Sequence, residues 1–397
     1  MTLALRALLV ISRIHLPEAS AASFRLDAVE RAMAKLGRPV RVLTTTVPDQ
    51  EPDDPEGVQV SRWPALRDSS GYLRGYLPYM SFDLPLALRL LASPRPAIAL
   101  VEPPPTTGVV SRIVLGARRI PYVWYAPDVW SEATEGTDAP AAVKKAVRWM
   151  ESFAIRGARG VVAISDDVAE RVRALGGREI HVVPNGIDTE IFTSTGPVPS
   201  EDERARIGLG QRYFVYAGTA SEWQGAEIFV EGLRRLHDSD PDVQILFLGG
   251  GSAWPSLQEA SSDLRTSDGR PSVVFLASLP PREAAEWQRG ALASLVSIRP
   301  GLGYDFAYPT KILASLACGT PVLYAGVGPA TVDIHDYALG EVADYEAGAV
   351  ASAMKECASQ ERGPEKRAHL HQWVDDHRSI RATGQAVAQI LNGYARE

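Results

Sequence analysis

The chain has 397 residues, of which 45% are hydrophobic and 22% charged, with 41 Lys and Arg against 48 Asp and Glu. This composition indicates a globular protein of two or three domains and excludes global disorder and a fibrous chain. The net charge of −7 argues against a nucleic-acid partner, and two cysteines are too few for a disulfide framework, so we expect a cytoplasmic protein.

The first half of the chain alternates short apolar runs with longer amphipathic stretches. The run at residues 5–12 predicts a buried first strand rather than a signal peptide, because charged residues follow it at once. We predict the other strands of this half at 40–44, 97–101, 122–125, 160–164 and 180–183. We predict helices at 23–37, near 84–91, at 141–155 and at 166–175. This alternation predicts a parallel sheet covered by helices on both faces.

The same pattern starts again in the second half. We predict its strands at 213–216, 243–248, 273–276, 292–297 and 321–324. We predict helices at 225–237, within 253–264, at 281–289 and near 311–318. The segment 193–202, rich in Ser, Thr, Gly and Pro, suits a hinge. A last helix near 379–394 has no strand after it, and we expect it to pack back on the first half.

Two loops that follow predicted strands are rich in glycine. Gly218 follows the strand at 213–216, and the glycines at 249–251 follow the strand at 243–248. Glycine lets a ligand approach the backbone and leaves amides at a helix start, which suits phosphate. A tight turn without a ligand is the alternative for each loop. Because the two loops occupy equivalent places in successive strand–helix units, together they favour phosphate binding.

Residues 308–322, YPTKILASLACGTPV, predict a polar loop, a helix that ends at Gly319 and the start of a strand. Lys311 falls in the first turn of this helix, where the helix dipole disfavours a cation. An anionic ligand would explain the lysine there, and a solvated lysine is the alternative.

Four segments, taken in order, resemble the retaining glycosyltransferases of family 4, which have the GT-B architecture. They are VPNGID at 183–188 with Phe192, YAG at 216–218 with Gly225, FLGGG at 247–251, and LACGTPV at 316–322. Pro17 with Glu18, PDVWSE at 127–132 and PTK at 309–311 resemble the branch that builds bacterial surface polysaccharides.

The resemblance implies an α/β fold of GT-B architecture, with two doubly wound Rossmann-like domains facing each other across a cleft. Residues 1–192 would form the acceptor-side domain and residues 203–376 the donor domain, with residues 377–397 as the helix that packs back. The family implies a metal-independent transfer of a sugar, with retention, from a nucleotide-diphosphate sugar to an acceptor hydroxyl. The acceptor would be a glycan, a lipid-linked glycan or a small molecule, and no cofactor is implied. Catalysis would rest on stabilising the leaving diphosphate.

Carried over by position, the resemblance implies catalytic roles for Asp128, Arg299 and Lys311. The donor side would comprise Gly218, Thr219, Gln224, Gly250, Gly251, Leu276, Ala277, Ser278, Tyr304, Asp305, Thr310 and Ser315. The acceptor side would comprise Glu18, Ser20 and Ala21.

The sequence departs from the family pattern at the donor site. The family's paired glutamates fall at Phe306 and Ala314, and its first-loop Arg and Lys fall on Thr219 and Gln224. The second glutamate normally holds the ribose, and Ser315 is a substitute to consider. The alternatives are a non-catalytic nucleotide-sugar-binding relative and a nucleotide-sugar epimerase on the same architecture.

In the surface-polysaccharide branch, Lys311 and Arg299 would serve the diphosphate, and Tyr304 or Asp305 would help to hold the sugar. The D-x-D at 238–240 lies between a helix and a strand and favours a turn, so we expect no metal. Aromatic and basic residues are interspersed at 63–82, which suggests weak peripheral association at the inner face of a membrane. A loop and helix packed on the first sheet is the alternative.

Overall fold

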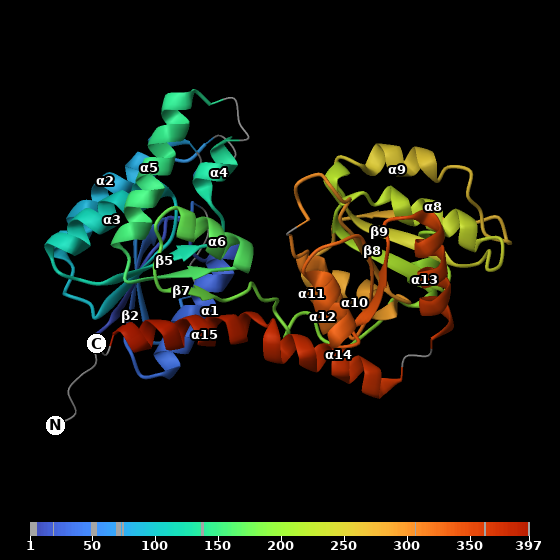
Figure 1. The fold of residues 1–397 in the computed structure, drawn as a ribbon. Helices are drawn as coiled ribbons and strands as arrows, with labels where there is room; N and C mark the ends of the chain where they lie inside the picture. The colour runs from blue at the N-terminus through green and yellow to red at the C-terminus, as the bar shows by residue number, and fades with distance from the viewer. Residues whose placement is uncertain are drawn as a thin grey trace. The chain divides into compact units, whose positions relative to one another are not determined.

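The computed structural model describes residues 6–18, 20–48, 54–68, 73, 75–135, 139–305, 307–360 and 363–395. The chain divides into two compact units (Figure 1), unit 1 from Met1–Gly186 with Ile380–Glu397 and unit 2 from Ile187–Ser379. Each unit is a parallel sheet flanked by helices, which confirms the predicted pair of Rossmann-like folds. The division at Ile187 comes earlier than the expected hinge at 193–202, so residues 187–192 go with the second unit.

The sheet of unit 1 has the strand order β3-β2-β1-β4-β5-β6-β7, with every neighbouring pair parallel. Its strands are β1 (Leu8–Ile11), β2 (Val40–Thr45), β3 (Val58–Trp63), β4 (Ile98–Val101), β5 (Tyr122–Ala126), β6 (Gly160–Ala163) and β7 (Ile180–Val182). Strands β1, β4, β5 and β6 are buried along their whole length, as continuous apolar runs predict. The unpredicted β3 is an edge strand that alternates half-buried and exposed residues.

Helices cover both faces of this sheet. They are α1 (Ala21–Lys35), α2 (Tyr76–Ala92), α3 (Pro105–Ala117), α4 (Trp130–Glu135), α5 (Ala141–Gly157), α6 (Asp166–Ala174) and α15 (Ile380–Tyr394). Leu9 and Ile11 of β1 join a core with α2, α3 and α5, whereas the alternate residues Leu8 and Val10 join a core with α1 and α15. The period of two along the strand therefore sends successive side chains to opposite helical layers.

Unit 2 has the strand order β10-β9-β8-β11-β12-β13, again parallel throughout. Its strands are β8 (Tyr213–Thr219), β9 (Gln244–Gly250), β10 (Val273–Ala277), β11 (Ser294–Ser297), β12 (Val322–Ala325) and β13 (Gly340–Ala343). Its helices are α7 (Glu201–Arg206), the short 3₁₀ turn η1 (Glu222–Gln224), α8 (Glu227–Leu236), α9 (Trp254–Ala260), α10 (Pro281–Gly290), α11 (Thr310–Ala317), α12 (Ala330–Asp336), α13 (Ala347–Ser359) and α14 (Pro364–His377).

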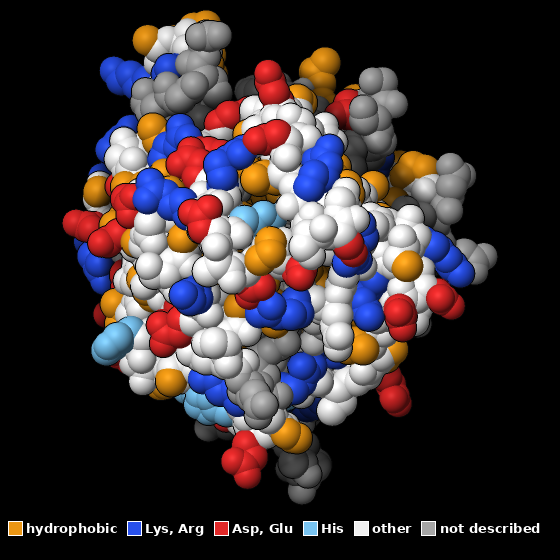
Figure 2. Space-filling model, turned by 90° about the vertical axis from the view of Figure 1, so that its right-hand side faces the viewer, with side chains coloured by type: hydrophobic (Ala, Val, Ile, Leu, Met, Phe, Trp, Pro, Cys, Tyr) orange, Lys and Arg blue, Asp and Glu red, His pale blue; other side chains and the backbone are white. Residues whose placement is uncertain are grey.

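The surface carries mixed charge on the face drawn in Figure 2, where basic and acidic side chains are interspersed and apolar side chains are scattered. Scattered apolar side chains of this kind are ordinary on a solvated surface. Along the described residues, no helix is both long enough and apolar enough to cross a bilayer.

The strand orders locate one switch point in each sheet, where the winding of the chain changes direction. In unit 1 it lies between β1 and β4, and in unit 2 between β8 and β11. Ligands of open α/β sheets bind outside the carboxyl ends of the strands at such points. The residues that directly follow these four strands are therefore the first to consider.

Candidate functional site

Lys311 meets the end of strand β8 at the switch point of unit 2. It lies in the first turn of α11, as predicted, and its Nζ donates to the carbonyl oxygen of Thr219 at 2.9 Å. The ammonium also lies 3.8 Å from the centroid of the Tyr216 ring. A Cβ on Gly218 would lie 3.9 Å from Lys311 Cε, so the structure brings together Gly218, Thr219 and Lys311.

The surroundings of Lys311 are poor in negative charge. It forms no ion pair with a carboxylate of the described residues, and its partners are a carbonyl and an aromatic ring. Burial lowers the pKa of Lys311 to about 7, because the charged form loses hydration without gaining a counterion. An anion bound beside it would supply that counterion and raise the pKa again.

The glycines at the carboxyl ends of β8 and β9 let the two strand ends and the residues after them approach closely. A Cβ on Gly249 would lie 2.4 Å from the Gly218 carbonyl oxygen, and a Cβ on Gly251 would lie 2.1 Å from that of Ala220. Both have a positive φ, 144° and 141°. These two positions thus need glycine without any ligand, whereas Gly250 has open space on its Cβ side.

Two predicted donor residues, Ser315 and Gln224, are buried and have partners within unit 2. Ser315 is fully buried and its hydroxyl bonds Gln288 Oε1 of α10 and the carbonyl of Lys311, both at 3.0 Å. Gln224 is also buried, and its Oε1 accepts from the backbone amide of Ser221 at 3.0 Å to close the η1 turn. That face of α11 packs against α10, so Ser315 is not presented to the surface, and its role as a substitute for the ribose glutamate stays a prediction.

Arg299 has partners of its own. Its guanidinium pairs with Glu227 at the start of α8, and its Nε donates to the Tyr345 hydroxyl at 3.4 Å. With Glu231 and Arg235, these residues border a hollow of about 420 Å³. The guanidinium already has a carboxylate, so it is less available to a diphosphate than the ammonium of Lys311.

The loop between β11 and α11 is ordered by its own contacts. Tyr304 stacks on Trp223 with ring centroids 4.5 Å apart, and both Asp305 carboxylate oxygens accept from the amide of Gly301. Thr310, next to Lys311, is exposed. Phe306 lies outside the described residues.

The end of β10 offers surface to a ligand. Leu276 is half-buried, and Ala277 and Ser278 are exposed just beyond it. Ala314, at the position of the family's second glutamate, is buried within α11.

At the switch point of unit 1, the structure shows a buried charge cluster that the sequence did not single out. Glu102, directly after β4, is 4% exposed and accepts from Arg25 Nη2 and from Ser12 Oγ, each at 3.3 Å. Arg13, the second residue after β1, lies over the rings of Tyr79 at 4.8 Å and Trp130 at 5.6 Å. Burial raises the pKa of Glu102 although Arg25 opposes the shift.

Asp128 follows β5 and is exposed at this edge of unit 1. Loss of hydration raises the pKa of its carboxyl, and the charges of Arg25 and Arg13 oppose that shift. Arg13 and Glu102 also follow strand ends, and that position is the one signal in the sequence by which they could have been predicted as site residues.

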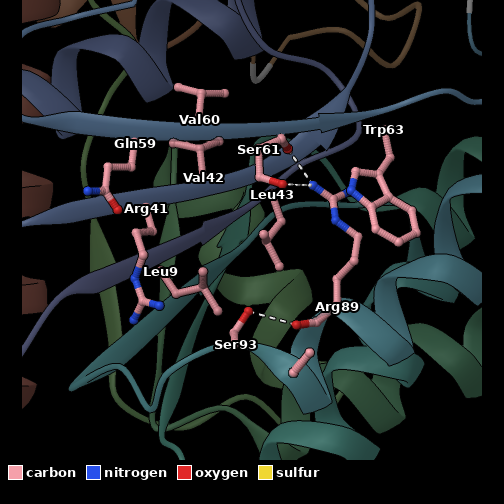
Figure 3. A pocket seen from close by; sticks show the side chains of 11 residues that line it. Leu9, Arg41, Val42, Leu43, Gln59, Val60, Ser61, Trp63, Arg89 and Ser93 are labelled. Carbon is pink, nitrogen blue, oxygen red and sulfur yellow. Dashed lines mark hydrogen bonds between the residues drawn. The ribbon is translucent and has the colours of Figure 1, made fainter.

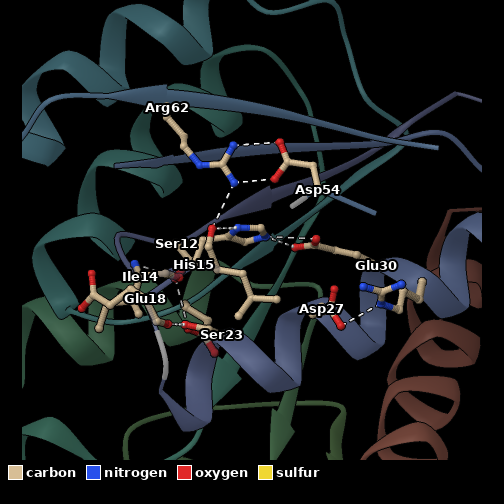
Figure 4. Close-up of polar contacts among 12 residues, drawn as sticks. Ser12, Ile14, His15, Glu18, Ser23, Asp27, Glu30, Asp54 and Arg62 are labelled. Carbon is tan, nitrogen blue, oxygen red and sulfur yellow. Dashed lines mark hydrogen bonds and ion pairs between the residues drawn. The ribbon is translucent and has the colours of Figure 1, made fainter. Parts of the chain in front are cut away.

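The loop between β1 and α1 is held in place by polar contacts (Figure 4). Glu18 accepts from Arg67 Nη1 at 2.8 Å. Ser20 caps α1 by accepting from the amide of Ser23 at 3.1 Å, and Ala21 is the exposed first residue of that helix. Ser20 therefore has a structural task besides the predicted acceptor role.

A buried histidine–glutamate pair anchors the start of this loop, as Figure 4 also shows. His15 Nε2 lies 3.1 Å from both Glu30 oxygens, and Nδ1 lies 3.0 Å from the carbonyl of Leu16. Both ring nitrogens thus face acceptors, so the pair holds a proton. Burial alone would lower the pKa of His15, but the hydrogen bond and charge of Glu30 outweigh it and raise the pKa. Arg62 Nη2 donates to the same carbonyl at 3.0 Å.

A hollow of about 320 Å³ lies between strands β1–β3 and helix α2 (Figure 3). Arg89 of α2 donates to the Thr44 carbonyl and to Ser61 Oγ, each at 3.0 Å, and lies 5.2 Å from the Trp63 ring. Burial lowers the pKa of Arg89 to about 10. Its bonds tie α2 to two strands, and no predicted site residue lines this hollow.

Part of the segment at 63–82 packs against the sheet. Phe82 is buried, Tyr79 lies beneath Arg13, and Arg67 is engaged with Glu18, while Trp63 is 45% exposed. Tyr72 and Arg74 lie outside the described residues. Nowhere in the described ranges do three or more His, Cys, Asp or Glu side chains gather as a metal site would require.

Two family models match the chain, one in each half. Residues 22–186 match the model described as Glycosyl transferase 4-like domain, and residues 211–360 match that of Glycosyl transferases group 1. Together the two matches cover most of the chain.

Curated relatives are similar over part of their length. A D-inositol 3-phosphate glycosyltransferase of Nocardiopsis dassonvillei is 27% identical over 259 residues, which are 62% of this chain and 57% of that protein. An alpha-maltose-1-phosphate synthase of Mycolicibacterium smegmatis is 28% identical over 209 residues, 50% of this chain and 52% of that protein. The chain thus spans little more than half the length of these relatives.

Solved structures share the fold over the whole chain. Anabaena Alr3699/HepE in complex with UDP aligns with a TM-score of 0.66 and 16% identity, over 98% of this chain and 100% of that one. A glycosyltransferase of Rickettsia africae aligns with a TM-score of 0.70 and 14% identity, over 99% of each chain.

Proposed function

We propose, on the premise that this chain belongs to the family 4 glycosyltransferases, that it moves a sugar from a nucleotide-diphosphate sugar to an acceptor hydroxyl. Unit 2 would bind the donor at the end of β8, and unit 1 would bind the acceptor near Asp128 and Glu18. Anabaena Alr3699/HepE, which has the same fold, is recorded with UDP and with UDP-glucose, which agrees with a donor of this class.

The observation that carries the proposal is the ammonium of Lys311. It lies at the switch point of unit 2 without a carboxylate partner among the described residues, next to the exposed Gly218 and Thr219. Burial lowers the pKa of this amine, and no counterion lies beside it in the described part of the chain, which makes it a candidate for a functional residue. A diphosphate is the ligand that would supply the missing charge.

The proposed transfer needs no protein nucleophile. As the bond between sugar and diphosphate breaks, negative charge grows on the leaving diphosphate, and Lys311 would stabilise that charge. The acceptor hydroxyl would attack the same face of the sugar, with its proton passing to a departing phosphate oxygen, so configuration is retained. In this scheme the lysine replaces a metal ion, the nucleotide sugar is a co-substrate, and no resident cofactor takes part.

Fewer observed contacts support the proposed acceptor side than support the donor side. Asp128 is the exposed acid with a raised pKa at the carboxyl edge of unit 1. We propose that it orients the acceptor hydroxyl or a hydroxyl of the transferred sugar. Glu18, which Arg67 holds in position, would also face the acceptor. The acceptor class remains a glycan, a lipid-linked glycan or a small molecule.

A thermal-shift screen tests the donor site first. The wild type is measured with UDP, GDP, dTDP, ADP and CMP, alongside Lys311→Met and the control Lys355→Ala, which removes an exposed lysine of α13 in the same unit. A ligand at 100 times its Kd should add about 2.7 kcal/mol of stability. We expect one diphosphate to stabilise the wild type and Lys355→Ala but not Lys311→Met.

The unliganded Lys311→Met variant also reports on its own folding. The pKa of this lysine is about 7 in the folded protein and 10.5 for the free side chain. At any pH between these two values, the unfolded chain therefore binds more protons than the folded chain. The charged lysine therefore costs stability at pH 7, and methionine should raise the melting temperature. A stabilised variant without a nucleotide response would support the donor site, and an equal response in both proteins would contradict it.

A non-catalytic nucleotide-sugar-binding protein is the second candidate. It is favoured by Ala314 at the glutamate position, by the inward-turned Ser315 and by the pairing of Arg299 with Glu227. It predicts donor binding without release of free nucleotide in the presence of any acceptor. A nucleotide-sugar epimerase, the third reading, predicts an altered sugar on the donor when no acceptor is present. Product analysis of the donor with and without acceptor separates the three.

A further inference from the structure

Helices α2, α3 and α5 form one layer over a single face of the unit 1 sheet (Figure 1). Helix α3 packs against both of the others, and all three contribute to the same core. We name the outward side of this layer the α2–α3–α5 face. The large apolar side chains exposed on it are Leu77, Leu84, Leu88 and Leu91 of α2, Ile113 of α3, and Val143 and Trp149 of α5.

Helix α2 reverses the usual pattern of a surface helix. Its exposed leucines at 84, 88 and 91 follow the spacing of one helical face, and each is more than half exposed. Its charged residues point inward instead. Asp83 accepts from Thr107 Oγ1 at 2.5 Å, and Arg89 donates to the strand carbonyls. A helix that faces water alone would carry its charges outside.

The charges on this face are of one sign. The three helices contain two acids, Asp83 and Glu151, and both are buried. Lys145 and Arg148 of α5 are exposed and form no ion pair among the described residues. Next to the layer, Arg95 follows α2 and Arg119 follows α3, and both are exposed.

The chain's overall charge conceals a difference between the units. Unit 1 contains 25 Lys and Arg against 21 Asp and Glu, whereas unit 2 contains 16 against 27; together these give the chain totals of 41 and 48. Unit 1 is thus net basic and unit 2 strongly acidic. The face that exposes apolar side chains without exposed acids belongs to the basic unit.

We propose that the α2–α3–α5 face docks on a bilayer that contains anionic lipids. Leucines and a tryptophan beside lysine and arginine are the side chains that insert at the boundary between headgroups and acyl chains. Trp149 stacks on Phe153 at 5.4 Å, which gives an aromatic pair suited to that depth. A symmetric second copy would bring together two faces whose exposed charges are both basic, so an anionic surface fits the charges better.

The docking surface stands independently of sugar transfer. Flotation of the full chain with vesicles tests it, using phosphatidylcholine alone and phosphatidylcholine with phosphatidylglycerol. We expect binding to the anionic vesicles that weakens as salt is added. Each Lys or Arg near such a surface contributes about 1 kcal/mol, or about fivefold in affinity. Lys145→Gln with Arg148→Gln should therefore weaken binding about 25-fold.

A second variant and a matched control define the result. Leu84→Gln with Leu88→Gln should also reduce binding, and at high salt as well as low. The control Arg282→Gln with Val332→Gln makes the same kinds of change at exposed positions of unit 2 and should bind like the wild type. Nucleotide binding, measured on the same proteins, should stay unchanged in all of them, which shows that they are folded.

Three outcomes would overturn the proposal. The first is a wild type that does not float with anionic vesicles at low salt. The second is equal flotation of the wild type and both variants of the face. The third is a wild-type dimer in sedimentation that the leucine variant dissociates, which would make a second copy the occupant. A failure of nucleotide binding would instead count against the donor site and leave this surface untouched.

Discussion

Lys311 shows how far a single residue can be interpreted from sequence. Its place in a first helical turn predicted an anionic partner. The structure adds burial, a carbonyl partner and, among the described residues, no carboxylate partner. The role expected of Ser315 could not be judged from the sequence alone, because it depended on which face of α11 packs against α10. Arg13 and Glu102 were missed because one charged residue after a strand forms no motif, and only folding brings the two strand ends together.

The lowered pKa of Lys311 predicts how nucleotide affinity should change with pH. Bound diphosphate favours the protonated amine and should raise its pKa above the value of about 7 in the free protein. Below pH 7 the lysine already carries its proton, so it adds no pH dependence. Above pH 7 binding must take up a proton, and affinity should fall by up to tenfold per pH unit.

Calorimetric titration of the selected nucleotide from pH 6.5 to 9 measures this effect. Comparison of buffers with different ionisation heats gives the proton uptake directly. The variant Lys311→Met should bind weakly and without the fall above pH 7, so it separates the lysine from the nucleotide's own ionisation. An affinity that is constant from pH 7 to 9 in the wild type would contradict a proton linked to Lys311.

At the scale of elements, every interior strand was predicted, whereas of the four edge strands β7 and β10 were predicted and β3 and β13 were missed. A continuous apolar run such as β5 has few other interpretations, because both of its faces are covered. The unpredicted β3 and β13 are the outer strands of their sheets and carry polar residues. Helix α3 was missed because it begins with prolines and contains Gly108, whose Cβ would lie 2.5 Å from that of Ala154 on α5. Close packing of α3 against α5 requires a glycine at this position, and a single sequence does not reveal that packing.

The contact between α1 and α15 gives a test of such packing. A Cβ on Gly384 of α15 would lie 2.5 Å from the carbonyl carbon and oxygen of Ala28 on α1. Because both atoms are helix backbone, Gly384→Ala must push the helices apart, and we expect a loss of about 1–3 kcal/mol in the free energy of unfolding.

Gly393→Ala is the matched control in the same helix. Among the described residues, nothing lies within 4 Å of a Cβ at Gly393, so the change should be neutral or should stabilise by up to about 1 kcal/mol through helix propensity. Urea unfolding followed by circular dichroism gives both free energies. Equal effects of the two substitutions would mean that α15 does not pack closely on α1.

At the scale of the whole molecule, unit 1 is assembled from both ends of the chain and unit 2 from one continuous segment. Val387, Ala388 and Leu391 of α15 share a core with β1, β2 and α1, so the last helix belongs to unit 1 although unit 2 precedes it in sequence. The lone helical pattern without a following strand predicted this return. Among the described residues, each large hydrophobic cluster lies within one unit.

Separate cores predict that a bound nucleotide stabilises one unit alone. At 100 times its Kd, a ligand of unit 2 should slow exchange through unfolding about 100-fold for the amides of β8, β9 and β11. The amides of β1, β4 and β5 belong to other clusters and should exchange at the same rate with and without nucleotide. Hydrogen exchange read by mass spectrometry resolves the two sets, and Lys311→Met should show protection in neither. Equal protection of both units would mean that they unfold together, and protection of unit 1 alone would place the nucleotide on the wrong sheet.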